Sequence, residues 1–172
     1  MKTTASKITI ARIALIPVFL LLAYNGYQYW AFAVFVIASL SDTLDGYIAR
    51  HYNQVTNFGK FMDPLADKML VLSAMCYMVE VGQMPGWCVA IVLFREFAVS
   101  GLRLIAVEQN RVIAAAWSGK IKTTVTMIGL CAMLIFPDVQ ILNTISIILI
   151  VVTTMYSGIE YFYKNRDVLK EA

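Results

Sequence analysis

Four aspartates within a short stretch of an otherwise apolar chain are the residues best suited to chemistry. Asp42 and Asp45 stand three positions apart, and Asp63 and Asp67 stand four apart. On helices, either spacing places both carboxylates on one face. Ionised carboxylates within a membrane are costly unless they are paired or bind a cation. Because oxygen ligands at this density suit hard cations, the aspartates predict a site for two Mg²⁺ or Mn²⁺ ions.

Small and basic residues accompany the two aspartate pairs. Gly46 and Gly59 each lie one helical turn from an aspartate, and they leave room for a bulky ligand to approach the helix. Ala49 has a small side chain and leaves the same helix accessible. The guanidinium of Arg50 offers several donors suited to phosphate oxygens. Together these residues predict a phosphate-binding site beside the metal ions.

A structural interpretation of the same residues is the alternative. Gly46 and Ala49 would also allow helices to pack closely in a membrane. Asp63 directly precedes a proline, so it would suit an N-cap, with the proline at the first helical position. Lys60 and Lys68 would be able to neutralise the aspartates in ion pairs. The whole set in this order favours the functional interpretation, because uncompensated carboxylates in a membrane are usually functional.

The rest of the composition predicts that the motif lies in a membrane. The chain is 60% hydrophobic and 15% charged, with a mean hydropathy of +0.71. Most of its apolar runs approach the roughly 20 residues that cross a bilayer. There are six such runs: Ile10–Tyr24, Ala31–Ile48, Pro64–Val79, Trp87–Val107, Ile121–Phe136 and Val139–Tyr163. We expect an all-α protein with six transmembrane helices in a single domain over residues 1–172.

Turn residues and charges set the expected topology. The connections near Asn25-Gly26, Gly82 and Pro137-Asp138 contain no Lys or Arg, whereas both termini and the other two junctions are basic. The positive-inside rule therefore places both termini and the aspartate motif on the cytoplasmic side. The segment before Ile10 would suit a short interfacial helix, and no cleavable signal peptide is evident. The single histidine, His51, excludes histidine-rich metal sites and serine–histidine triads.

The aspartate motif resembles the complete signature of the CDP-alcohol phosphotransferases. It reads Asp42-x-x-Asp45-Gly46-x-x-Ala49-Arg50, eight residues, then Gly59-x-x-x-Asp63-x-x-x-Asp67. The resemblance implies a six-helix membrane enzyme, usually a homodimer, in which an acceptor hydroxyl displaces CMP from a CDP-linked lipid or alcohol. It implies that the four aspartates bind the metal ions and that Asp67 is also the catalytic base. The implied CDP pocket consists of Gly46, Ala49, Arg50 and Gly59.

Further segments resemble the phosphatidylglycerophosphate synthase branch of that family. They are Val55–Lys68, Arg95–Arg103, Gly119–Thr123 and the opening Ile8-Thr9-x-x-Arg12. Ser6 and Thr126 depart from the asparagine and glutamine that are common in this branch. The resemblance implies CDP-diacylglycerol and sn-glycerol 3-phosphate as substrates, with no nucleic-acid partner. It also implies a bacterial cytoplasmic membrane as the location, with the active site at the cytoplasmic face.

A group of cations agrees with an anionic acceptor. Arg103, Arg111, Lys120 and Lys122 surround the junction of the fourth and fifth runs, where a phosphate would need such a pocket. Their alternative role is positive-inside anchoring. Arg95 lies deeper, and it either contacts substrate or forms an ion pair with Glu96 or a carboxylate of another helix. Glu96, Ser100 and Arg103 share one helix face by their spacing.

Two other functions remain as alternatives. One is a sister phosphotransferase with another acceptor, such as phosphatidylglycerol, serine or inositol phosphate. The other is an ion-coupled transporter that uses its aspartates as a cation site. Transporters usually contain inverted repeats, and the sequence shows no repeat.

Overall fold

The computed structural model describes the backbone of residues 4–51, 57–109, 111, 113, 114 and 116–170, which contains helices and no strand. Side chains are described for residues 10–41, 65, 66, 68–109, 111, 113, 114 and 116–168. The chain divides into two compact units, Met1–Val81 and Gly82–Ala172. The expectation of a single domain over residues 1–172 stays a prediction.

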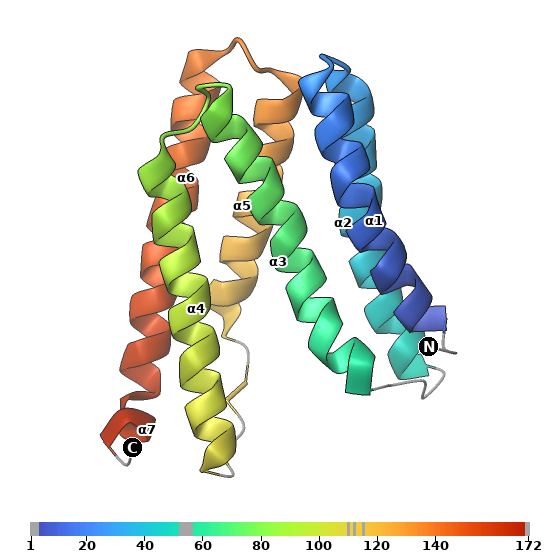
Figure 1. Ribbon diagram of the computed structural model, residues 1–172. Coiled ribbons are helices and arrows are strands. Elements are labelled where there is room, and N and C mark those ends of the chain that lie inside the picture. Colours follow the sequence, from blue (N-terminus) through green and yellow to red (C-terminus); the bar gives the residue numbers. More distant parts are fainter. Residues whose placement is uncertain (1–3, 52–56, 110, 112, 115, 171–172) are drawn as a thin grey trace. The chain divides into compact units, whose positions relative to one another are not determined.

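The first unit contains α1 (Thr4–Tyr24), α2 (Gln28–His51) and α3 (Asn57–Glu80), and α1 packs against both of the others (Figure 1). Gly26 forms the turn between α1 and α2 with a φ of 80°, a left-handed conformation that favours glycine. The helices alternate in direction, so the start of α1, the end of α2 and the start of α3 lie at one end of this unit. The aspartate motif is therefore at the same end as the amino terminus of α1.

Aromatic side chains fix the opposite end of the first unit. The ring of Phe19 lies 5.7 Å from that of Phe35 and 6.4 Å from that of Tyr77, measured between centroids. The Tyr77 hydroxyl donates to the carbonyl of Ala23 at 3.2 Å, and the Tyr24 hydroxyl donates to Glu80. Such aromatic pairs add about 0.5–1.5 kcal/mol beyond their buried area. These contacts set the register of α3 against α1, and hence the position of the motif.

The second unit contains α4 (Gly86–Glu108), α5 (Trp117–Ile135), α6 (Gln140–Lys164) and the short α7 (Arg166–Lys170). α6 packs against α4 and α5, and α7 packs against α4. At Gly129 a β-carbon would lie 3.1 Å from Cδ1 of the buried Ile150, so this glycine allows α5 and α6 to approach closely. The end of α4, the start of α5 and the end of α6 lie at one end of the unit.

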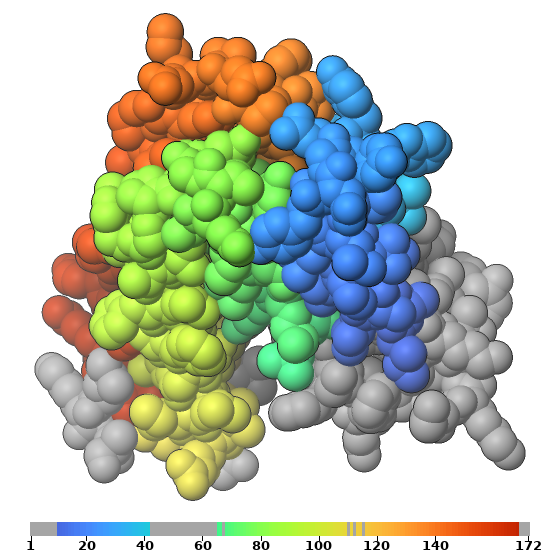
Figure 2. Space-filling view, turned by 45° about the horizontal axis from the view of Figure 1, so that its top comes forward, coloured from blue at the N-terminus to red at the C-terminus, as the bar shows by residue number. Residues whose placement is uncertain are grey.

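The surface of the helices has the polarity expected of a membrane protein. α4 exposes 78% of Phe94 and 71% of Phe97. The side chains of α4 form the yellow-green part of the surface in Figure 2. In contrast, Arg12, Lys122 and Ser157 are buried. Soluble proteins show the reverse distribution, whereas lipid accepts apolar side chains and forces polar ones inward. Within the described residues, α5 and α6 are long and apolar enough to cross a membrane, and Ile10–Tyr24 and Gln28–Ser41 are shorter apolar helices.

The six predicted apolar runs lie on helices except for Phe136 and Val139, which cap α5 and α6. α1 begins at Thr4 and continues without interruption, so the segment before Ile10 is not a separate interfacial helix. α3 begins at Asn57, so Asp63 lies inside the helix and the N-cap alternative for it is wrong. The five residues of α7 were not predicted, because so short a helix has no apolar periodicity. Six membrane spans and cytoplasmic termini stay predictions.

Candidate functional site

The aspartate motif lies on two helices of the first unit that contact each other. α2 carries Asp42, Asp45, Gly46, Ala49 and Arg50, and α3 carries Gly59, Asp63 and Asp67. Both aspartate pairs are thus on helices, as the spacing argument requires. Their side chains lie outside the described residues, so the predicted metal and CDP contacts stay predictions.

A buried arginine lies beside the start of this motif. Arg12 of α1 is fully buried, and its Nε donates to Oγ of Ser41 at 3.3 Å. Ser41 in turn donates to the carbonyl of Ala38 at 2.7 Å and directly precedes Asp42. A buried guanidinium needs compensating negative charge or polar partners. Arg12 was not predicted as part of the site, although its charge inside the apolar run Ile10–Tyr24 is a signal that the sequence offers.

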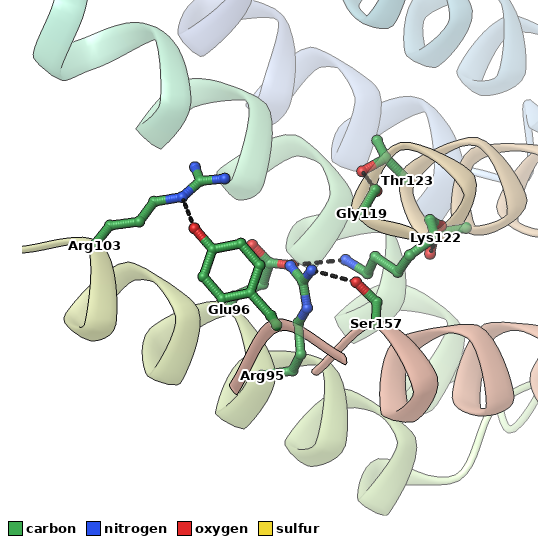
Figure 3. A network of polar contacts seen from close by, with 9 residues as sticks. Arg95, Glu96, Arg103, Gly119, Lys122, Thr123 and Ser157 are labelled. Atoms are coloured by element: carbon green, nitrogen blue, oxygen red, sulfur yellow. Dashed lines mark hydrogen bonds and ion pairs between the residues drawn. The ribbon is translucent and has the colours of Figure 1, made fainter. Parts of the chain in front are cut away.

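In the second unit, Glu96 is the shared partner of two cations. Its Oε1 lies 2.9 Å from Nη1 of Arg95 and 2.8 Å from Nζ of Lys122 (Figure 3). The side chains of Arg95, Glu96 and Lys122 are only 12%, 16% and 7% exposed. Nη2 of Arg95 also donates to Oγ of Ser157 at 2.5 Å. The network therefore joins α4, α5 and α6.

Arg95 lies against two glycines of neighbouring helices. A β-carbon at Gly158 would lie 3.3 Å from Cγ of Arg95, and one at Gly119 would lie 3.5 Å from its Nη2. Its Nε is buried and has no hydrogen-bond partner among the described atoms. The ion pair with Glu96 that the sequence left open is confirmed, whereas substrate contact by Arg95 stays a prediction.

Arg103 has a different setting from Arg95. Its Nε donates to the hydroxyl of Tyr161 at 2.7 Å, and its guanidinium carbon lies 5.4 Å from the centroid of that ring (Figure 3). Arg103 is exposed, while Tyr161 is 2% exposed and packs with Val99 and Leu102. No described carboxylate lies within ion-pair distance of Arg103. This cation therefore keeps its positive charge at an accessible position.

The other two predicted acceptor ligands lie apart from the Glu96 network. Nζ of Lys120 lies 5.1 Å from the centroid of the Trp117 ring, and Lys120 is exposed whereas Lys122 is buried. Residues two apart on a helix do not share a face, which explains the difference. Arg111 lines a cavity of about 500 Å³ together with Tyr161, Lys164 and Asp167. The five predicted cations thus occupy several different settings in the unit.

Ser157 and Tyr161 are the polar partners that sequence reasoning missed. Both lie on α6, in a run that the sequence marks only as apolar. A serine or tyrosine in such a run has no distinguishing spacing, so no local signal pointed to either residue.

No alternative metal centre competes with the aspartates in the described residues. Among them, no group of three or more His, Cys, Asp or Glu side chains is placed to hold an ion. Cys76, Cys88 and Cys131 are free thiols at separate positions of the helices. Asp42, Asp45, Asp63 and Asp67 lie outside the described side chains and stay the predicted metal ligands.

Comparison with known proteins identifies relatives along most of the chain. The sequence model of the CDP-alcohol phosphatidyltransferase family matches residues 2–156. A Bacillus subtilis protein named CDP-diacylglycerol–glycerol-3-phosphate 3-phosphatidyltransferase is 40% identical over 189 residues, covering 96% of each chain. The Escherichia coli protein of the same name is 34% identical over 170 residues, covering 92% of each. A probable phosphatidylglycerophosphate synthase of Mycobacterium tuberculosis is 36% identical over 165 residues, covering 91% of this chain and 78% of the relative.

Proposed function

The chain belongs to the CDP-alcohol phosphatidyltransferase family, and we propose that it transfers the phosphatidyl group of CDP-diacylglycerol to sn-glycerol 3-phosphate. The products are phosphatidylglycerophosphate and CMP. The observation that carries this proposal is the complete aspartate motif on α2 and α3, in a chain whose relatives are named for this reaction. The enzyme is a phosphotransferase of phospholipid biosynthesis.

The donor set of the motif fits divalent cations. Four carboxylates on two helices in contact provide only oxygen ligands, which Mg²⁺ and Mn²⁺ prefer. Asp42, Asp45, Asp63 and Asp67 would hold two ions, which when bound neutralise negative charge on the diphosphate. Gly46, Ala49, Arg50 and Gly59 form the CDP pocket in this proposal, with Arg50 donating to phosphate oxygens.

Asp67 acts as the general base in the proposed reaction. It takes the proton of the primary hydroxyl of glycerol 3-phosphate while that oxygen attacks the β-phosphorus of CDP-diacylglycerol. A new phosphorus–oxygen bond forms to glycerol phosphate. The bond from the β-phosphorus to the bridging oxygen breaks, and CMP leaves with its electron pair. Positioning of the two substrates supplies much of the rate.

The acceptor phosphate binds at the basic end of the second unit. Arg103 suits it best, because its charge is accessible and no described carboxylate neutralises it. Arg95 and Lys122 together exceed the charge of Glu96 by one, so their network adds a net positive field. Lys120 and Arg111 lie near the same end of the unit and contribute longer-range attraction for a dianion.

The protein spans the cytoplasmic membrane with six helices, and its active site faces the cytoplasm. Support comes from the two helices that can cross a bilayer, the exposed apolar side chains and the basic residues gathered at one end of the second unit. A homodimer is part of the proposal, because the family resemblance implies one. The acyl chains of the lipid substrate reach the site from the bilayer.

Release of CMP from CDP-diacylglycerol by the purified protein tests the proposal. We expect release with Mg²⁺ and sn-glycerol 3-phosphate and none after EDTA. A panel containing glycerol, serine and inositol phosphate tests the acceptor in the same assay. Release with another acceptor alone would contradict the proposed substrate but keep the family reaction. No release with any acceptor, from folded protein, would contradict the reaction itself.

A further inference from the structure

We propose that Tyr161 is a positioning residue that orients Arg103 toward the phosphate of the acceptor substrate. The inference rests on the proposed function, because it assigns Arg103 to the acceptor. Tyr161 itself touches no reacting atom in this proposal. It acts through the hydrogen bond that its hydroxyl accepts from Nε of Arg103 at 2.7 Å.

The Tyr161 ring is a fixed element of the second unit. It is 2% exposed and packs in a cluster with Val99, Leu102, Ala106 and Val168. The cluster joins α4, α6 and α7, so buried side chains of other helices restrict the motion of the ring. Its hydroxyl is therefore an acceptor at a fixed position, beside an arginine that is otherwise exposed.

The geometry of the bond leaves the phosphate-binding edge of Arg103 available. The tyrosine hydroxyl accepts from Nε, so this hydrogen bond uses neither of the two terminal nitrogens. Two terminal nitrogens suit bidentate recognition of a phosphate. The ring face adds an attraction for the guanidinium, whose carbon lies 5.4 Å from the ring centroid.

Arg103 differs from the neighbouring cations in the charge of its partner. Arg95 and Lys122 both lie against Glu96, and Lys164 pairs with Glu160. Arg103 has a neutral partner in place of a carboxylate, so its orientation is fixed without loss of its charge. An exposed arginine without such a partner would lose side-chain freedom when it binds the phosphate. Tyr161 reduces that entropic cost before substrate arrives.

The kinetic test compares Tyr161→Phe with the wild type in the CMP-release assay. The substitution keeps the ring and its packing but removes the hydroxyl. Since a hydrogen bond to a charged group is lost, we expect KM for glycerol 3-phosphate to rise about tenfold. We expect kcat and KM for CDP-diacylglycerol to stay within about twofold of the wild type. Tyr156→Phe, an exposed tyrosine of the same helix, is the matched control and should leave all three unchanged.

A double-mutant comparison separates positioning from a general structural role. Arg103→Lys keeps the charge but removes Nε and the fork, so it should raise KM for glycerol 3-phosphate on its own. In the Arg103→Lys background, Tyr161→Phe should raise KM for glycerol 3-phosphate by less than about a further twofold, because its effect passes through Arg103. An equal effect in both backgrounds, or a fall in kcat without a change in KM for glycerol 3-phosphate, would overturn the proposal.

The CMP-release assay distinguishes an error in the proposed substrate from an error in the role of Tyr161. If the wild type releases CMP with glycerol 3-phosphate but neither substitution alters its KM, only the role of Tyr161 and Arg103 is refuted. If the wild type releases CMP only with an acceptor that carries no phosphate, the substrate assignment fails and the role of Arg103 fails with it.

Discussion

Replacing Glu96 with Gln should destabilise the protein more than any other single charge removal in the second unit. Glu96 lies between Arg95 and Lys122 at 2.9 Å and 2.8 Å, and none of the three side chains is more than 16% exposed. The substitution keeps the shape and an acceptor oxygen, but it leaves two buried cations without their shared counter-charge. Removing one partner of a buried ion pair costs about 3–5 kcal/mol. Because the amide oxygen still accepts a hydrogen bond, we expect about 3 kcal/mol.

Thermal unfolding in detergent measures the effect. At about 2–4 °C for each kcal/mol, the midpoint of Glu96→Gln should fall by about 6–12 °C. Glu108→Gln is the matched control, since this residue is exposed at the end of the same helix, and its midpoint should shift by less than about 2 °C.

Lys122→Met tests whether loss of one cation costs less stability than loss of the shared carboxylate. It removes one cation but leaves Arg95 to neutralise Glu96, so its cost should be well below that of Glu96→Gln. Two results would refute the role of Glu96 as the shared partner. One is an equal unfolding midpoint for Glu96→Gln and Glu108→Gln. The other is a larger fall in the midpoint for Lys122→Met than for Glu96→Gln.

Other substitutions test the site and the packing. Asp67→Asn should retain binding of CDP-diacylglycerol but lose about 10²–10⁴-fold in turnover, as loss of a general base predicts, and full activity would contradict that role. Asp42→Asn and Asp63→Asn should raise the Mg²⁺ concentration needed for half-maximal CMP release; an unchanged Mg²⁺ titration would exclude them as ligands. Gly129→Ala should lower the unfolding midpoint, because its β-carbon would meet buried side chains at 3.1 Å and 3.4 Å. Gly101→Ala is the control, because a β-carbon there would have no neighbouring atom within 4 Å. Its unfolding midpoint should stay unchanged or rise by an amount equivalent to about 1 kcal/mol. If Gly101→Ala lowered the midpoint as much as Gly129→Ala, close packing at Gly129 would not explain the effect.

The helices were predictable because long apolar runs and turn residues are local signals. Gly26 and Gly82 do adopt left-handed conformations, with φ of 80° and 76°, in the connections where the sequence indicated turns. The helix starts were less predictable. α3 begins at Asn57, seven residues before the apolar run, since polar residues at an interface continue a helix without apolar periodicity.

The candidate site was predictable only in part, for a physical reason. The aspartate motif depends on spacing along two helices, which the sequence states directly. The partners of Arg95 and Arg103 depend on which helices pack together. Ser157 and Tyr161 lie 62 and 58 residues away from them, and nothing local marks either residue. The Arg95–Glu96 pair was an open alternative, because the two residues are neighbours in the sequence. The contact between Glu96 and Lys122 depends on α6, which packs against both α4 and α5.

Transfer of phosphorus from labelled glycerol 3-phosphate into lipid is the decisive test of the proposed reaction. Purified protein, CDP-diacylglycerol and Mg²⁺ are incubated with ³²P-labelled sn-glycerol 3-phosphate, and the lipid extract and released CMP are both measured. We expect labelled phosphatidylglycerophosphate and CMP in equal amounts, and neither product after EDTA. Release of CMP without labelled lipid would contradict glycerol 3-phosphate as the acceptor, and absence of both products from folded protein would contradict the proposed reaction.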